Sequence, residues 1–226
     1  MIKILALLVN FAVALSAAAA DLSAITNADA ANGLKQALTD GSAIAVAKLG
    51  VENGFLSNPQ VKIPLPPALQ RVEAALRFAG LRKQADDLVV AMNHAAEAAV
   101  PEAKALLVDS VRRMTIQDAK AVLTGGDTAA TDYFRRTTHD QLMARFLPIV
   151  KQTTDRVGLA EQYNALAAPA AQLGVVKRDQ ATIEGYVTEK ALDGLYFMIG
   201  EQEKAFRRNP LGAASDIVKR VFGAVK

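Results

Sequence analysis

Residues 114–150, MTIQDAKAVLTGGDTAATDYFRRTTHDQLMARFLPIV, carry the signals that decide the fold. Thr115 followed three residues later by Asp118 is a capping-box pattern, and we expect the Gly-Gly pair at 125–126 to supply the left-handed residue that ends this first helix. A second helix is then expected to start at Asp127. Its apolar side recurs at three- and four-residue spacing through Ala130, Phe134, Thr138, Leu142, Phe146 and Ile149. This stretch predicts a helix, a sharp turn and a longer helix with one buried face.

The same periodicity over the rest of the chain predicts an all-α, single-domain bundle of about eight helices. A loose lead-in up to Asn32 should precede a helix that Gly41 breaks or bends. Further helices are expected from the prolines at 66–67 to Gly80, at 81–100, 101–113, 127–157, 159–174, 182–208 and 213–222. We expect Phe78 on the buried face of the 66–80 helix, and Ala105, Leu106, Val108 and Val111 on that of the 101–113 helix.

One short extended arm is expected near residues 59–67. Val61, Ile63 and Leu65 alternate there with polar or proline residues, which is typical of an extended segment. The prolines cannot donate the hydrogen bonds that a central strand needs. We therefore expect an extended arm laid on the helices, with a lone edge strand as the alternative.

Residues 1–20, MIKILALLVNFAVALSAAAA, have the form of a signal peptide, with one early lysine, an apolar run and a small-residue end. This leaves residues 21–226 as the helical domain, which we expect to be soluble and periplasmic. No later segment approaches the ~20 apolar residues of a membrane helix. The absence of cysteine excludes disulfides and thiolate metal sites.

The charge pattern argues against nucleic acid as a partner. Basic and acidic residues nearly balance, with 26 Lys and Arg against 23 Asp and Glu. A nearly balanced surface attracts a polyanion only weakly. Basic residues beside apolar ones in the helix expected over 213–222 allow at most a weak contact with a membrane surface, and docking on the protein's own domain is the alternative.

Several runs of sequence resemble the bacterial domain-of-unknown-function family 4197. They are VKIPLP at 61–66, MNHAAEAAVPEA at 92–103, DAKAVLTGGDTAATDYF at 118–134, FLPIV at 146–150, YVTEKALDGLYFMIGEQEKAFRRNP at 186–210 and VFG at 221–223. The resemblance implies an exported helical envelope protein. It implies no established activity, substrate or cofactor.

The polar residues suggest chemistry only weakly. Glu97, Asp118 and Glu203 would support an enzyme if they converged in a cleft, although a helix cap at Asp118 and an ion pair from Glu203 to Arg207 are the simpler interpretations. His94 and Glu97 share a helix face, but a single pair is too few ligands, so we expect no metal site and no cofactor. The turn at 125–128 leads into a helix N-terminus, where an anion or the cap residue itself could accept hydrogen bonds.

Our first hypothesis is a non-enzymatic binding domain. Aromatic residues are doubled at 133–134 and at 196–197, so at least one of each pair should leave the core face. Together with nearby charged residues they would form a surface for an unknown protein or a small apolar ligand. That surface would comprise Tyr133, Phe134, Arg135, Tyr196, Phe197 and Glu203. An oligomeric envelope scaffold built through the long helices is a further alternative.

Overall fold

A computed structural model describes residues 27–158, 160–163, 165 and 182–209. In that part of the chain the α-helices are α2 (Asn27–Leu49), α3 (Pro67–Gln70), α4 (Glu73–Phe78), α5 (Arg82–Ala99), α6 (Ala103–Arg113), α7 (Ile116–Thr124), α8 (Ala129–Arg156) and α10 (Ile183–Arg208), and one 3-10 turn, η1 (Val100–Glu102), joins α5 to α6. The described ranges contain no strand. The predicted all-α fold is therefore confirmed. The leader, the helix over 213–222 and most of the helix over 159–174 lie outside the described residues.

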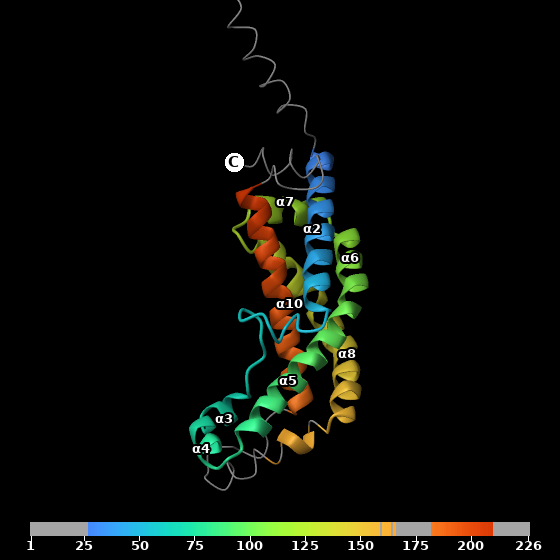
Figure 1. Ribbon diagram of the computed structural model, residues 1–226. Coiled ribbons are helices and arrows are strands. Elements are labelled where there is room, and N and C mark those ends of the chain that lie inside the picture. Colours follow the sequence, from blue (N-terminus) through green and yellow to red (C-terminus); the bar gives the residue numbers. More distant parts are fainter. Residues whose placement is uncertain (1–26, 159, 164, 166–181, 210–226) are drawn as a thin grey trace, which may run out of the picture.

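The long helices α2, α8 and α10 form the body of the bundle (Figure 1). Helix α10 packs against α8, α2 and α5, and α8 also contacts α5 and α6. The short helices α3 and α4 lie at one end of the bundle, beside the start of α5 (Figure 1). None of the helices in the described ranges combines the length and the apolar character that crossing a bilayer requires.

A continuous cluster of buried apolar side chains fills the space between these helices. The stripe predicted for α8 is buried as expected, except that Val150 and not Ile149 completes it. Helix α8 continues through Pro148 to Arg156, and the chain then turns at Gly158 in the left-handed region, with φ of 61°. The continuation past Pro148 and the stop at Gly158 are both confirmed.

Helix α2 differs from the prediction in two places, at its start and at Gly41. It begins at Asn27, so residues 27–32 are helical, and it runs through Gly41 without interruption. A Cβ atom at Gly41 would lie 3.2 Å from Cε2 of Phe206. The glycine therefore lets the end of α10 approach α2 closely, and packing outweighs the low helix propensity of glycine.

The segment from Pro66 to Gly80 forms two short helices where one was predicted. Gly80 ends the second with φ of 75°, as expected. Phe78, however, is 98% exposed at the end of the bundle. In α6 the buried face is also rotated from the prediction, with Leu107 and Ser110 buried while Ala105 is exposed. Helical spacing identifies a repeating face, but it leaves the direction of that face to the neighbouring elements.

The turn between α7 and α8 is built differently from the prediction. The Thr115–Asp118 capping box is present, but Gly125 has an extended backbone with φ of −80° and ψ of 176°. A Cβ at Gly125 would lie 2.6 Å from the Cβ of Ala129. Close approach and not left-handed geometry therefore requires glycine there. The N-cap position of α8 is Thr128 and not Asp127, and the Thr128 side chain makes no capping hydrogen bond.

The predicted arm is present as an irregular connection over residues 50–66. Asn93 on α5 binds both backbone groups of Ile63: Oδ1 accepts from the Ile63 amide at 2.8 Å, and Nδ2 donates to the Ile63 carbonyl at 2.9 Å. A side-chain amide thus supplies the two hydrogen bonds that a neighbouring strand would have supplied. The side chains of Phe55, Ile63 and Leu65, which belong to this connection, are buried.

Candidate functional site

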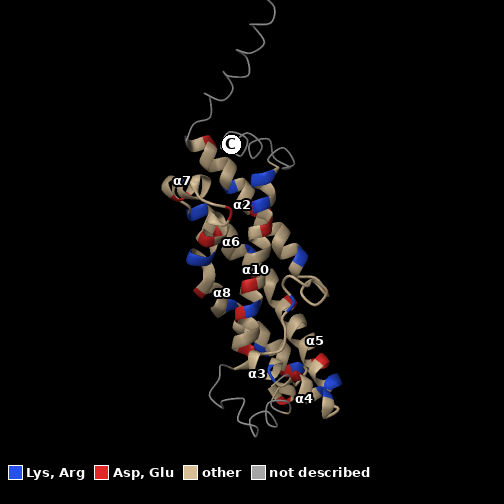
Figure 2. Ribbon diagram, turned by 90° about the vertical axis from the view of Figure 1, so that its left-hand side faces the viewer, with Lys and Arg blue, Asp and Glu red and all other residues tan. Residues whose placement is uncertain are grey.

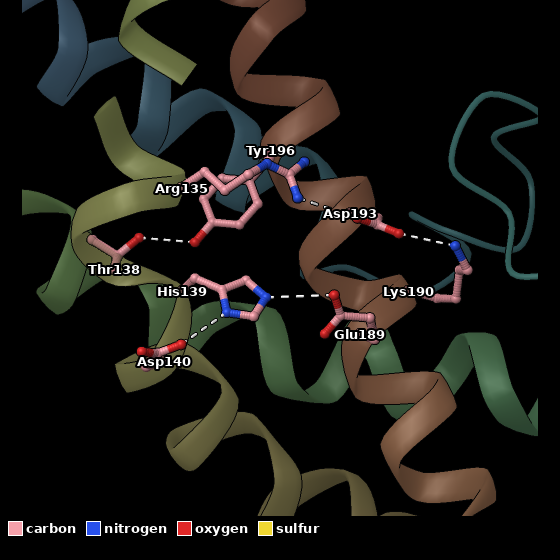
Figure 3. A network of polar contacts seen from close by, with 8 residues as sticks. All are labelled: Arg135, Thr138, His139, Asp140, Glu189, Lys190, Asp193 and Tyr196. Atoms are coloured by element: carbon pink, nitrogen blue, oxygen red, sulfur yellow. Dashed lines mark hydrogen bonds and ion pairs between the residues drawn. The ribbon is translucent and has the colours of Figure 1, made fainter. Parts of the chain in front are cut away.

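The seam between α8 and α10 contains two of the residues expected at the ligand surface, Arg135 and Tyr196 (Figure 3). Tyr196 is fully buried, and its hydroxyl lies 2.9 Å from that of Thr138. The guanidinium of Arg135 covers the tyrosine ring, with Cζ 4.7 Å from the ring centroid. Burial raises the pKa of Tyr196, while the hydrogen bond to Thr138 and the charge of Arg135 oppose that rise. Tyr196 is thus a neutral, packed side chain.

The outer part of this seam contains two separate groups of polar contacts, one around His139 and one around Asp193 (Figure 3). His139 lies between two carboxylates, with Nε2 3.4 Å from Glu189 and Nδ1 3.2 Å from Asp140. Asp193 contacts Arg135 at 3.4 Å and Lys190 at 2.9 Å. Each acidic group therefore has a basic neighbour. Exposed pairs of this kind contribute little individually, ~0–1 kcal/mol. The contacts of Arg135 with Asp193 and of His139 with Glu189 join α8 to α10.

The doubled aromatics do not both behave as predicted. Tyr133 is 5% exposed and donates a hydrogen bond from its hydroxyl to the Ser110 carbonyl at 2.9 Å, while Phe134 is fully buried. Helix α8 contacts α6 as well as α10. Both residues can therefore be buried, and the expectation that one leaves the core is wrong for this pair. In the second pair Tyr196 is buried and Phe197 is partly exposed.

Glu203 is buried and binds the N-terminus of α8. Its carboxylate accepts hydrogen bonds from the amides of Ala130 at 2.9 Å and Thr131 at 3.1 Å, and from the Thr131 hydroxyl at 3.0 Å. Arg207, one turn further on, contacts the same carboxylate at 2.9 Å and donates to the Val122 carbonyl at 2.7 Å. The anion that the sequence suggested for this helix N-terminus is therefore a carboxylate of the protein itself.

Glu97 plays a comparable part for the arm. It accepts from the amides of Asn53, Phe55 and Leu56 at 3.1, 3.0 and 3.1 Å. Nδ1 of His94 lies 2.7 Å from the same carboxylate. Three converging amide donors fix the position of the Glu97 side chain beneath the turn that follows α2.

The three carboxylates of the enzyme hypothesis are thus used at different places in the fold. Glu97 binds the turn after α2, and Glu203 binds the start of α8. Asp118 closes the capping box of α7, where the hydrogen bonds from Thr115 lower its pKa. Within the described ranges no group of three or more His, Asp or Glu side chains is placed to hold a metal ion.

An open groove that the sequence did not reveal lies between the arm, α4 and the first half of α5. Its volume is about 870 Å³. It is lined by Leu56, Pro59, Lys62, Pro64, Leu65, Gln70, Glu73, Leu76, Arg77, Arg82, Ala85, Asp86, Val89 and Val90. The sequence signal nearest to the groove was the proline-rich arm, which forms one of its walls.

The charges that line this groove are mostly paired. Arg77 contacts Glu73 at 2.5 Å, and Arg82 lies 3.8 Å from Asp86. Figure 2 shows the same alternation of basic and acidic residues along the other helices. The groove therefore presents apolar walls with a rim of neutralised charge.

Comparison with known proteins identifies the family and nothing further. Residues 24–223 match the family described as protein of unknown function (DUF4197). No curated protein and no solved structure matches the chain significantly. Because the match extends over nearly the whole chain, the protein belongs to the DUF4197 family.

Proposed function

We propose that the protein is an exported, non-enzymatic binding module that holds a small apolar ligand in the groove between the arm, α4 and α5. The groove's volume of about 870 Å³ carries this proposal. Ligand sites commonly have volumes of ~300–1,000 Å³, mainly apolar walls and a few polar groups. The apolar walls of the groove are Leu56, Pro59, Pro64, Leu65, Leu76, Ala85, Val89 and Val90.

The arm that forms one wall is held at several points. Besides the two bonds from Asn93 to Ile63, Gln70 donates from Nε2 to the Leu65 carbonyl at 2.6 Å. Tyr186 of α10 donates from its hydroxyl to the Pro64 carbonyl at 3.1 Å, and burial raises the pKa of Tyr186 to about 12. A wall that is fixed before binding loses less conformational entropy when the ligand enters.

Two further arguments support a binding role for an exported protein. Glu97, Asp118 and Glu203 each accept hydrogen bonds from the protein's own groups, which leaves them poorly suited to acid–base chemistry on a substrate. The leader-like residues 1–20 favour export to the periplasm. A periplasmic address gives such a protein access to the apolar molecules that pass through the envelope.

The proposal can be tested with the neutral fluorescent dye N-phenyl-1-naphthylamine, whose emission rises in apolar surroundings. The double variant Leu56→Gln/Val89→Gln makes two half-buried groove residues polar. Leu106→Gln/Val108→Gln is the matched control, since these α6 residues are also half-buried but do not line the groove. We expect saturable dye binding by the wild type and the control, and binding about tenfold weaker for the groove variant.

Two results would contradict the ligand-binding proposal. The wild type could fail to take up the dye, or the groove variant could bind it as tightly as the wild type. Thermal unfolding of both variants, followed by circular dichroism, separates loss of binding from loss of folding. Similar melting temperatures for the two variants are required before their dye affinities are compared.

A second candidate, an oligomeric scaffold, is favoured by the exposure of Phe78 at the end of the bundle. An aromatic side chain that is 98% exposed gains apolar contacts if a second copy covers it. Light scattering of the wild type and of Phe78→Ser over a range of concentrations tests this role. A monomer at all concentrations for both proteins would exclude it.

A further inference from the structure

The groove between the arm, α4 and α5 has more basic than acidic side chains in its lining. Lys62, Arg77 and Arg82 line it, against Glu73 and Asp86. Each of the two acids has an arginine of its own helix beside it, with Arg77 at 2.5 Å from Glu73 and Arg82 at 3.8 Å from Asp86. Lys62 pairs with neither acid. Three positive charges against two negative ones leave the lining with an excess positive charge, which Lys62 carries.

Lys62 lies on the side of the arm that faces the groove. Burial alternates along this part of the arm, since Val61, Ile63 and Leu65 are buried, whereas Lys62 and Pro64 are exposed. Side chains two residues apart in an extended segment point to the same side. Lys62 and Pro64 therefore share one side of the arm, and both line the groove. The ammonium group of Lys62 is available at the wall that a ligand would contact.

The hydrogen-bonding groups of the arm wall also favour a ligand that accepts hydrogen bonds. The Pro64 carbonyl already accepts from the Tyr186 hydroxyl at 3.1 Å, and the Leu65 carbonyl accepts from Nε2 of Gln70 at 2.6 Å. The side-chain amide of Gln70 has a second N–H group, and the Lys62 ammonium has three. The backbone acceptors of this wall are thus in use, while side-chain donors remain for an incoming group.

We infer that the groove binds an amphiphile with one aliphatic chain and a carboxylate head, the chemistry of a medium-chain fatty acid. This inference rests on the proposed ligand-binding function and names the class of ligand. The carboxylate pairs with Lys62, and the chain lies against the apolar walls that include Leu76 and Val89. The aliphatic stem of Lys62 extends the apolar wall up to its charged end.

Other ligand classes match this lining less well. A cationic head would meet the excess positive charge, and a neutral head would leave Lys62 without a counter-ion. A small anion with no chain would gain only an exposed ion pair, which is weak in water. Most of the affinity must come from apolar surface that the chain buries. The head group therefore selects among ligands, and the chain provides the binding energy.

Displacement of N-phenyl-1-naphthylamine from the full chain at neutral pH tests the inference. The competitors are decanoate, 1-decanol and decylamine, which share a ten-carbon chain and differ in charge, and acetate, which has the charge without the chain. Each is used below the concentration at which it aggregates and at one ionic strength. We expect decanoate to displace the dye at a concentration about fivefold lower than decanol and about tenfold lower than decylamine, with no displacement by acetate.

The possible failures separate the inference from the proposed function. If decanol or decylamine displaces the dye at the same concentration as decanoate or a lower one, the carboxylate head is wrong, while ligand binding by the groove stands. Displacement by acetate, or no displacement by decanoate, would also overturn the inference. Failure of the dye itself to bind would refute the proposed function, and the inference with it.

Charge reversal at Lys62 locates the head group. Lys62→Glu should reverse the preference, so that decylamine displaces the dye at a lower concentration than decanoate. Lys120→Glu is the matched control, because Lys120 is also exposed but belongs to α7, at the opposite end of the bundle from α3 and α4 (Figure 1). Both variants change the net charge equally, and we expect the control to keep the order of the wild type.

An unchanged order of competitors in Lys62→Glu would overturn the assignment, as would the same shift in both variants. The dye is neutral, so its retained binding shows that each variant keeps the fold and the apolar walls. Lys62→Met provides a second comparison, because it keeps most of the aliphatic stem and removes only the charge. We expect it to remove the advantage of decanoate over decanol, and a preserved advantage would exclude Lys62 as the partner of the carboxylate.

Discussion

Replacing Glu203 by glutamine should destabilise the fold strongly, although the two side chains have nearly the same shape. The carboxylate is 3% exposed and accepts from three donors of Ala130 and Thr131, and it pairs with Arg207, which is 14% exposed. Glutamine removes the negative charge and turns one acceptor into a donor. That donor would face the amide N–H of Ala130 or of Thr131, which can only donate, at the place where α8 begins.

The magnitude follows from the contacts that are lost. Each hydrogen bond to a charged group contributes ~1.5–3 kcal/mol to stability. Removing one partner of a buried ion pair costs ~3–5 kcal/mol. Both figures describe the loss of the same Glu203 carboxylate, so they are alternative measures of one effect and cannot be added. We therefore expect Glu203→Gln to lower the free energy of unfolding by about 3 kcal/mol. For a chain of this size that corresponds to a fall in melting temperature of roughly 6–12 °C.

Urea unfolding followed by circular dichroism at 222 nm measures this free energy. Glu201→Gln is the control, because Glu201 lies two residues before Glu203 on α10 and forms only a partly exposed ion pair with Lys204 at 2.9 Å. The control should cost less than ~1 kcal/mol. If both variants lose the same free energy, the carboxylate of Glu203 does not stabilise the start of α8 as argued.

Three further predictions concern packing and ionisation. Gly194→Ala should lower the free energy of unfolding by ~1–3 kcal/mol, because the new Cβ would lie 2.6 Å from Cε1 of the buried Phe55; chemical denaturation measures it. Hydrogen bonds from Thr115 lower the pKa of Asp118, so the stability that the capping box contributes should be present above about pH 4 and be lost as the pH falls through the lowered pKa. The free energies of unfolding of the wild type and of Asp118→Asn, compared across that pH range, measure this contribution. Tyr186 should ionise only near its pKa of about 12, which spectrophotometric titration detects as a transition missing from Tyr186→Phe.

The controls for these three predictions use neighbouring positions. Gly185→Ala meets nothing closer than 3.4 Å and should stabilise α10 by up to ~1 kcal/mol, so a loss there would show that packing at Gly194 is not the cause. For Asp118, a difference from the asparagine variant that stays constant down to the lowest pH would contradict the ionic contribution. For Tyr186, ionisation near pH 10 would mean that its hydroxyl is not buried against the arm.

Local sequence signals predicted the helices well because each depends on nearby residues. The Thr115–Asp118 capping box, the stops at Gly80 and Gly158 and the stripe of α8 all follow from chemistry within one or two turns. The ion pair between Glu203 and Arg207 is local in the same sense. These features needed no knowledge of the tertiary structure.

The remaining features depend on contacts between distant residues. Nothing near Glu203 in the sequence indicates that its carboxylate binds the amide of Ala130, which is 73 residues away. Likewise, burial of both Tyr133 and Phe134 requires neighbours on two sides of α8. The groove forms because the arm is held against α5 by Asn93, which is a tertiary contact as well. Sequence periodicity therefore predicted the helices. The positions of the candidate site residues depend on long-range polar contacts, which periodicity does not indicate.

The two anchors of the arm have a consequence for how the loop can vary in length. Glu97 fixes the chain at residues 53–56, and Asn93, one turn earlier on the same helix, fixes it again at Ile63. The residues between these points are mostly exposed and can change in number without shifting either attachment. Insertions after Leu56 should therefore be accommodated as a larger surface loop. A single deletion between Ile63 and Pro66 would instead displace Pro66 and Pro67 from the start of α3.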